Sequence, residues 1–204
     1  MSNIQELWKA SWDEALDGID LSTARVGGRA TKANPDKEDA TWWQTSGPKW
    51  LESYIEWRKN NSGWKIWKTP DGTPAIELGI VTEIEGVEVK MIIDRIFDVN
   101  GELVVVDLKT SQRLPSNPLQ LGFYKIGIEK QYGVPVNYGN YYMARQGGTG
   151  ELIDLSAFTH DKISYMIKMF DKARQAGIFI PNTNSCNTLC GFTDVCEFYP
   201  GKIG

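Results

Sequence analysis

The segment from Met91 to Thr110 constrains the fold more than any other part of this 204-residue chain. It reads MIIDRIFDVNGELVVVDLKT, two largely aliphatic runs separated by Asn100-Gly101. Asn-Gly between two such runs is a strong signal for a tight β-hairpin, because both residues tolerate a positive φ. We therefore expect two antiparallel strands here, each presenting alternate side chains to opposite faces of a sheet.

Charged side chains interrupt the second of these strands on one face only. Asp107 and Lys109 are two residues apart and share a face, whereas Val104, Val106 and Leu108 share the other. Placing an acid and an amine in a strand that is otherwise apolar costs desolvation energy. Such a cost often marks a functional site.

Asp94 on the preceding strand extends this pair into a candidate metal site. With the turn at Asn100-Gly101, the numbers of paired residues sum to about 201, which places Asp94 opposite Asp107. Neighbouring strands are about 4.8 Å apart, so both carboxylates can bind one cation. Carboxylates, a backbone carbonyl and water suit Mg²⁺ or Mn²⁺, and Lys109 beside the cation can orient or deprotonate a water. The alternative is a cross-strand salt bridge on a solvated face, which is the commoner explanation of an isolated Asp-x-Lys.

The remaining elements follow from periodicity and turn signals. Apolar residues at steps of three and four predict helices over 4–16, from Gly47-Pro48 to about 59, over 119–131 and over 159–176. Short apolar or alternating runs predict strands over 64–68, 75–82, 87–99, 103–109, 137–144 and 151–153. This order indicates an α/β or α+β domain with a central mixed β-sheet flanked by helices.

Composition limits the chemistry that the chain can perform. A single histidine, His160, excludes a two-histidine HExxH zinc site, and three cysteines exclude a fully paired disulfide scaffold. We see neither a signal-peptide pattern nor a run near the roughly 18 apolar residues that span a bilayer, so we expect a cytoplasmic, reducing environment and no membrane partner. The net charge of -4 gives no overall attraction to nucleic acid, although a local basic groove can still provide one.

Three short motifs together resemble one family. I-D-R-I at 93–96, D-L-K-T at 107–110 and Q-L-G-F-Y at 120–124 are similar to the PD-(D/E)XK nuclease superfamily, in particular to its branch of RecB/AddB-type nuclease domains and Cas4-like exonucleases in the small versions that bacterial viruses carry. The resemblance implies a restriction-endonuclease-like core with an N-terminal helical layer and a C-terminal cysteine-containing tail. We expect a single domain over 1–204, with the helical layer in 1–62, the catalytic sheet and its motif helix in 63–158, and the last helix and cysteine tail in 159–204.

The resemblance assigns roles to the residues of the hairpin. It implies that Asp94, Asp107 and the backbone carbonyl of Leu108 are ligands of Mg²⁺ or Mn²⁺. It implies that Lys109 is the catalytic lysine.

The resemblance also extends the site beyond the hairpin. Gln120 and Tyr124, four residues apart on one helical face, would form the motif of the following helix, with Gln120 positioning a substrate phosphate or the attacking water. Glu77, in A-I-E-L-G-I, resembles a further carboxylate one strand earlier, and a surface-facing strand glutamate is an equal alternative. The helix from Gly47 lacks the histidine that members of this branch commonly carry there.

The cysteines depart from the family pattern. Cys186, Cys190 and Cys196 resemble the C-terminal triple of the iron–sulfur members, but those members have a fourth cysteine near the N-terminus and this chain does not. A [4Fe–4S] cluster normally needs four thiolates. One alternative is an iron–sulfur cluster or a Zn²⁺ site whose fourth ligand is another residue such as Asp194 or comes from a partner chain. The other is a tail of three free thiols. Both stay open.

Basic residues mark candidate DNA contacts. Between Leu108 and Thr149 there are five basic residues and one acidic residue, a local charge of +4. Binding of phosphates by such a patch would depend strongly on salt, and ordinary solvated surface charge is the alternative. The candidates are Arg113 and Lys125 in this stretch, and Arg25, Arg29 and Lys32 near the N-terminus.

The sequence thus predicts an enzyme, a Mg²⁺-dependent deoxyribonuclease. We expect an exonuclease that acts on linear duplex or single-stranded DNA ends in recombination, repair or phage DNA processing, with a metal-activated water hydrolysing the phosphodiester bond. The alternatives are a catalytically silent DNA-binding or recombination accessory module and a structure-specific endonuclease. A phage-encoded product in the host cytoplasm, with a recombination or single-strand-annealing partner protein, fits this prediction.

Overall fold

The computed structural model describes residues 2–21, 26, 30, 32, 35, 37–183, 186, 190 and 192–199. The chain divides into two compact units, Met1–Lys49 with Gly177–Gly204, and Trp50–Ala176. The second unit contains the sheet and every residue predicted to form the active site. The division does not test whether the chain is a single domain, which stays a prediction.

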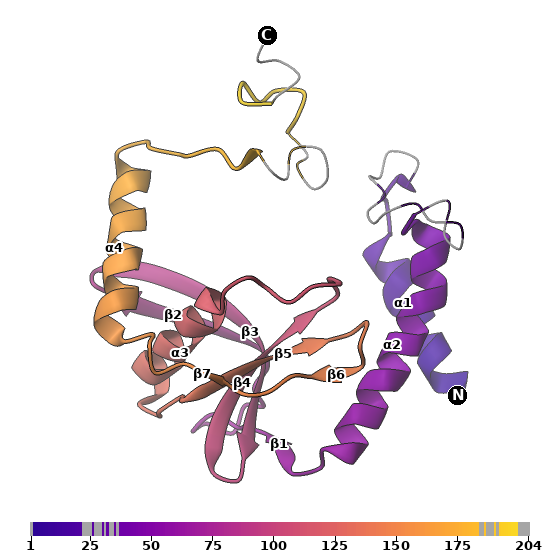
Figure 1. The fold of residues 1–204 in the computed structure, drawn as a ribbon, viewed down its shortest axis with the longest axis horizontal. Helices are drawn as coiled ribbons and strands as arrows, with labels where there is room; N and C mark the ends of the chain where they lie inside the picture. The colour runs from indigo at the N-terminus through magenta and orange to yellow at the C-terminus, as the bar shows by residue number, and fades with distance from the viewer. Residues whose placement is uncertain are drawn as a thin grey trace. The chain divides into compact units, whose positions relative to one another are not determined.

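The helices and strands of the described residues are mostly those that the sequence predicts (Figure 1). The helices are α1 (Ser2–Ala15), α2 (Ala40–Asn60), α3 (Leu119–Tyr132) and α4 (His160–Gln175). The strands are β1 (Trp64–Ile66), β2 (Ile76–Ile84), β3 (Val87–Val99), β4 (Glu102–Lys109), β5 (Tyr138–Met143), β6 (Gly148–Thr149) and β7 (Ile153–Asp154). None of the helices in the described part is long and apolar enough to cross a membrane.

The prediction that the second helix starts at Gly47-Pro48 is wrong, because α2 starts at Ala40. The helix begins after Asp39, whose Oδ1 accepts a hydrogen bond from the Trp42 amide at 2.8 Å, as an N-cap residue does. Gly47 lies inside the helix. A Cβ at this position would lie only 2.0 Å from Cζ2 of Trp8, so a larger residue would not fit. The glycine therefore serves close packing of α1 against α2, and the helix continues through Pro48.

The sheet is mixed, as predicted. Its order is β1-β3-β4-β5-β6, with β2 also paired to β3 and β7 also paired to β5. β4 and β5 are parallel, because α3 crosses from the end of one to the start of the other, and the other pairs are antiparallel. An α+β core with a curled mixed sheet and flanking helices agrees with the restriction-endonuclease-like expectation.

The predicted register of the β3–β4 hairpin is confirmed. Pairing runs outward from the turn to Arg95 opposite Val106, and each pair sums to 201. Asn100 and Gly101 form the turn with φ values of 56° and 91°, the positive values for which this dipeptide is suited. The hairpin therefore carries Asp94 to the level of the end of β4.

Each face of the sheet has its own apolar cluster. Val105 of β4 packs in a cluster with Leu121 of α3, whereas Val104 and Val106 pack in a second cluster with Trp57 of α2. β4 thus alternates as predicted. Positions 107 and 109 continue the face that carries α3.

The two short strands after β5 were only partly predicted. The sequence suggests a loop over 147–150 and a strand over 151–153, whereas β6 lies at Gly148–Thr149 and β7 at Ile153–Asp154. Both strands add to β5 through backbone hydrogen bonds. Glycine has no side chain whose pattern could have revealed this pairing.

Replacing Gly122 with alanine tests the packing that places α3. A Cβ at this position would lie 2.5 Å from ring atoms of Phe158, so we expect Gly122→Ala to lower the free energy of unfolding by about 1–3 kcal/mol in a urea titration. Gly79→Ala in β2 is the control, because a Cβ there meets nothing within 4 Å. Equal stability of the two variants would contradict this packing.

Candidate active site

Residues from three elements meet at the end of β4. Asp107 and Lys109 belong to β4, Asp94 to β3, and Gln120 and Tyr124 to the first turns of α3. α3 contacts both β2 and β4 (Figure 1), which brings its first turns over this end of the sheet. The structure thus gathers the five residues that the sequence singles out.

A continuous line of polar contacts runs from β4 to α3. Lys109 Nζ lies 2.6 Å from Asp107 Oδ2 and donates a hydrogen bond to Gln120 Oε1 at 3.0 Å. Gln120 Nε2 in turn donates to the hydroxyl of Tyr124 at 2.8 Å. The side-chain amide is held at both ends, and the Tyr124 hydroxyl keeps its own hydrogen for donation.

Asp94 is tied to β4 through the backbone. Its Oδ2 accepts a hydrogen bond from the Leu108 amide at 2.6 Å. This bond holds the Asp94 carboxylate beside Asp107, close enough for its charge to act on the Asp107 carboxyl. The Leu108 carbonyl as a metal ligand stays a prediction.

Asp107 is the most unusual group of the site electrostatically. Its side chain is only 4% exposed, and its Oδ2, despite the nearby ammonium of Lys109, has no hydrogen bond of good geometry. Burial raises the pKa of Asp107, the neighbouring ammonium of Lys109 lowers it, and the charge of Asp94 raises it again. Burial and the same two carboxylates also raise the pKa of Tyr124, where the hydrogen bond from Gln120 acts in the opposite direction.

The donor set fits a hard divalent cation. Asp94, Asp107 and the Leu108 carbonyl offer only oxygen, and a buried carboxylate oxygen without a hydrogen bond is a natural ligand. Among the described residues, no three His, Cys, Asp or Glu side chains are grouped so that they could hold a metal. Backbone oxygen and water would therefore complete the coordination shell.

Glu77 lies on β2 and is turned toward an arginine. Its Oε1 lies 3.2 Å from Nη1 of Arg95, and its side chain is 61% exposed. Its predicted role as a weak metal ligand is not tested by this contact and stays a prediction.

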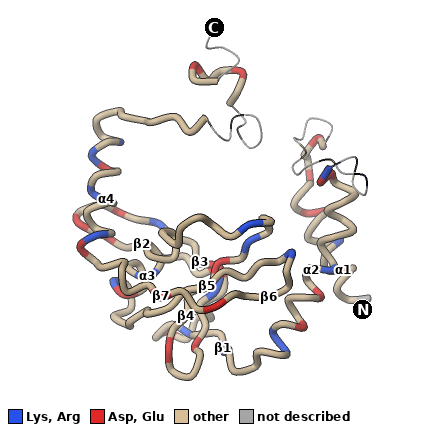
Figure 2. Tube along the Cα trace, in the orientation of Figure 1, with Lys and Arg blue, Asp and Glu red and all other residues tan. Residues whose placement is uncertain are grey.

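Figure 2 marks Lys and Arg in blue and Asp and Glu in red along the chain. The candidate DNA contacts among these basic residues differ in their contacts and exposure. The Lys125 side chain is 11% exposed, lies 2.5 Å from Glu129 and donates to the Val136 carbonyl at 2.8 Å. The structure therefore does not support Lys125 as a phosphate contact. Arg113 and Lys32 are exposed and stay predictions, and Arg25 and Arg29 lie outside the described residues.

Two further residues border the site: the sequence assigns no role to Tyr141 and counts Arg145 only among the basic residues between Leu108 and Thr149. Tyr141 of β5 pairs with Asp107, and its ring centre lies 5.9 Å from Lys109 Nζ. Arg145 donates from Nε to the carbonyl of Thr110 at 2.5 Å. Both come next to β4 through parallel pairing across a helical crossover, for which no local sequence signal exists.

The cysteine tail gives no support to a metal site. Cys186, Cys190 and Cys196 form no disulfide in the described part of the chain, and the first is buried and the others are partly exposed. No metal-binding group that includes them occurs in the part of the chain that the structure describes. His160 is exposed at the start of α4.

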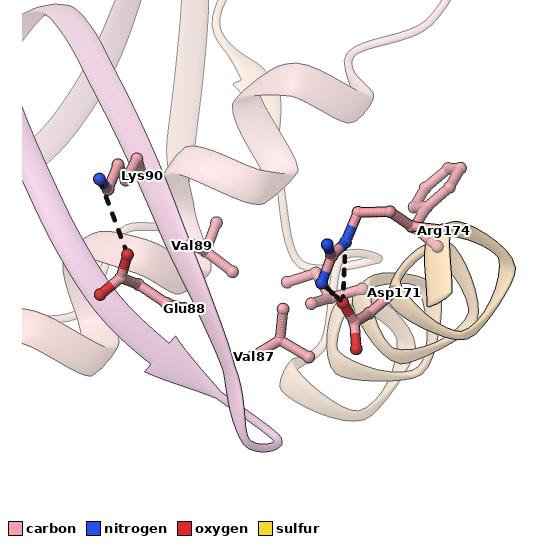
Figure 3. Close-up of a pocket in the computed structure, with 8 residues that line it drawn as sticks. Val87, Glu88, Val89, Lys90, Asp171 and Arg174 are labelled. Atoms are coloured by element: carbon pink, nitrogen blue, oxygen red, sulfur yellow. Dashed lines mark hydrogen bonds and ion pairs between the residues drawn. The ribbon is translucent and has the colours of Figure 1, made fainter. Parts of the chain in front are cut away.

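An open hollow of about 290 Å³ lies apart from these residues, between β3 and α4 (Figure 3). Two ion pairs border it, Lys90 with Glu88 at 3.7 Å and Arg174 with Asp171 at 2.7 Å. None of the predicted site residues lines it.

The chain matches one nuclease family and is similar to two phage proteins. A family model described as the PD-(D/E)XK nuclease superfamily matches residues 2–197. The chain is 30% identical over 221 aligned residues to the Gene 69 protein of Mycobacterium phage D29, with 95% of this chain and 80% of that protein covered. It is 31% identical over 193 residues to the Gene 69 protein of Mycobacterium phage L5, where the match covers 76% of this chain and 65% of that protein, just under two thirds.

The raised pKa of Asp107 makes a prediction about stability without metal. Because the folded protein binds this proton more tightly than the unfolded chain, stability falls as the pH rises above the ordinary carboxyl pKa of 3.8. We expect Asp107→Asn in EDTA to melt at a higher temperature than the unmodified protein at about pH 7, with a gap that narrows as the pH falls toward about 4.

Asp154 is the control of opposite sign. Hydrogen bonds from the backbone and side chain of Ser156 lower the pKa of Asp154, so Asp154→Asn should cost stability at about pH 7 and less at about pH 3. A melting-temperature difference for Asp107→Asn that does not change with pH would contradict this account of the site.

Proposed function

The chain belongs to the PD-(D/E)XK nuclease superfamily, and on this basis we propose that Asp94, Asp107, Lys109, Gln120 and Tyr124 form the active site of a DNA nuclease. The observation that carries the proposal is the buried carboxylate of Asp107, held 2.6 Å from Lys109 in the line of contacts to α3. A protein that only binds DNA has no need to bury an acid beside a lysine. This favours an active enzyme over a catalytically silent module.

The proposed cofactor is Mg²⁺ or Mn²⁺, held by Asp94, Asp107 and the Leu108 carbonyl. When bound, such a cation polarises the scissile phosphate and makes water a stronger nucleophile at neutral pH. The two carboxylates also lose their mutual repulsion when a cation lies between them.

The reaction is hydrolysis of a phosphodiester bond. The oxygen of water forms a new bond to phosphorus, the bond from phosphorus to the leaving sugar oxygen breaks, and one proton of the water ends on that oxygen. No other reactant is consumed. The products are a phosphate end and a hydroxyl end.

Lys109 supplies the fixed positive charge for this step. Its ammonium is held between Asp107 and Gln120, so it needs little rearrangement to offset the negative charge that grows on the phosphate in the transition state. Gln120 keeps Lys109 turned into the site, and Tyr124 fixes the amide of Gln120.

We further propose an exonuclease that acts on the ends of linear duplex or single-stranded DNA during phage DNA processing or recombination. The resemblance of the three motifs to the RecB/AddB and Cas4-like branch supports exonuclease activity, and the similarity to two mycobacteriophage proteins supports only the phage setting. A structure-specific endonuclease is the second candidate, because it would use the same chemistry.

The catalytic proposal predicts the effect of removing either charged residue of β4. Asp107→Ala and Lys109→Ala should each lower Mg²⁺-dependent release of nucleotides from a labelled linear duplex by at least about a thousandfold, while DNA binding persists. Lys130→Ala, on the exposed end of α3, is the matched control and should keep full activity. Full activity of either β4 variant, or equal activity of the unmodified protein in Mg²⁺ and in EDTA, would overturn the proposal.

A comparison of substrates separates the two modes of cleavage. An exonuclease should degrade linear duplex DNA and leave covalently closed circular DNA of the same sequence intact, because the circle offers no end. Cleavage of the circle at a rate comparable to that of the linear form would favour the endonuclease instead.

A further inference from the structure

β2 passes the active site with one residue in a left-handed conformation. Glu77 has a φ of 48°. The other described residues with positive φ that are not glycine, Lys37, Glu85 and Asn100, all lie outside the strands. L-residues adopt this conformation rarely, and when one does so inside a strand its surroundings must hold it there.

The pairing of β2 with β3 is interrupted at the same level. Ile76 pairs with Arg95 and Leu78 pairs with Ile93, but the residues between them do not pair. Ile93 and Ile96 lie in the same apolar cluster although their positions differ by three, and so do Ala75 and Leu78 of the facing chain, so the alternation of side chains shifts in both strands at this level. The paired numbers sum to 171 on either side of the gap, so neither strand carries an extra residue and the register is kept.

Arg95 connects the two irregular positions. Its Nη1 donates to Glu77 Oε1 at 3.2 Å and to the carbonyl of Asp94 at 2.5 Å. The Arg95 side chain is only 17% exposed. One partly buried cationic group therefore joins β2 to the backbone of Asp94.

Asp94 is consequently held at both ends. Arg95 binds its carbonyl, and the Leu108 amide binds its carboxylate. A shift of the backbone at this position would move the carboxylate relative to Asp107, and a cation shared by two carboxylates is sensitive to such a shift.

We propose that Glu77 and Arg95 form a clamp that positions Asp94 for the divalent cation. Both are positioning residues, with Glu77 acting through Arg95. In this proposal that positioning role replaces the weak metal-ligand role that the resemblance implies for Glu77, and neither residue binds the metal. The positively charged guanidinium of Arg95 forms an ion pair with the Glu77 carboxylate. This positive charge would repel a metal ion bound to Glu77. The clamp rests on the proposed function, because it presumes a metal at Asp94 and Asp107.

The first test measures binding of Mn²⁺ by calorimetry in the absence of DNA. Arg95→Gln should weaken Mn²⁺ binding roughly tenfold or more, as is typical when a group that orients a metal ligand is removed. Glu77→Gln should weaken it by a smaller factor. The double variant should bind Mn²⁺ no more weakly than Arg95→Gln alone, because the two residues act as one unit.

Cleavage gives a second readout of the same clamp. The Mg²⁺ concentration for half-maximal cleavage by Arg95→Gln should rise by about the factor found for Mn²⁺, and saturating Mg²⁺ should restore most of the rate. For Arg95→Lys, which keeps the charge, the Mg²⁺ concentration for half-maximal cleavage should lie between those of the unmodified protein and of Arg95→Gln. A merely structural ion pair would not shift the metal dependence.

Glu77→Gly separates strain from function. Glycine adopts a positive φ readily, so this variant should melt a few degrees higher while binding Mn²⁺ more weakly. Glu85→Gly is the matched control, because Glu85 has a φ of 53° in the turn between β2 and β3. It should also melt higher, with Mn²⁺ binding unchanged.

Three results would overturn the clamp. These are unchanged Mn²⁺ binding in a folded Arg95→Gln protein, additive effects in the double variant, or equal weakening by Lys90→Gln, which removes an exposed ion pair of the same strand. If Arg95→Gln does not fold, the two Glu77 variants decide the matter, because that side chain is largely exposed.

The proposed function fails separately. If Asp107→Ala retains Mn²⁺ binding, or if the unmodified protein binds none, the metal site is wrong and the clamp falls with it. If Asp107→Ala abolishes Mn²⁺ binding and Arg95→Gln does not weaken it, only the clamp is wrong.

Discussion

The burial of Asp107 beside Lys109 is the interaction on which the rest of the site depends. A carboxylate in this position is costly, which is why burial raises its pKa. β4 can hold it because the strand lies inside the sheet, paired to β3 on one edge and to β5 on the other. Lys109 offsets part of the cost, and Gln120 and Tyr124 of α3 keep Lys109 in place. A cation that binds both Asp107 and Asp94 would offset most of the remaining cost of burying the Asp107 carboxylate.

The fold could be predicted where a local signal and the tertiary structure agree. Asn100-Gly101 fixes the register of the hairpin, and that register brings Asp94 to the level of Asp107. The prediction failed at the start of α2, where Gly47 serves contact with Trp8 and does not mark a helix end. Packing between distant elements decided that case, and no local pattern records it.

The site residues that carry a local sequence signal could be predicted. Those that reach the site only through contacts between distant elements could not. Charged residues at steps of two in a strand and four in a helix identify Lys109 and Gln120 without any knowledge of tertiary contacts. Tyr141 lies beside Asp107 only because β5 pairs in parallel with β4. The left-handed backbone of Glu77 depends on contacts between strands. Local irregularity of this kind is expected at functional sites, where a sequence gives up some stability to hold a particular geometry.

The central claim is that Asp94 and Asp107 bind one divalent cation at the end of β4, in a protein of the PD-(D/E)XK nuclease superfamily. Anomalous scattering from crystals of the protein soaked in Mn²⁺ tests it most directly. The account predicts an anomalous peak about 2.1 Å from a carboxylate oxygen of each residue. A clear Mn²⁺ peak elsewhere, with none between Asp94 and Asp107, would contradict it.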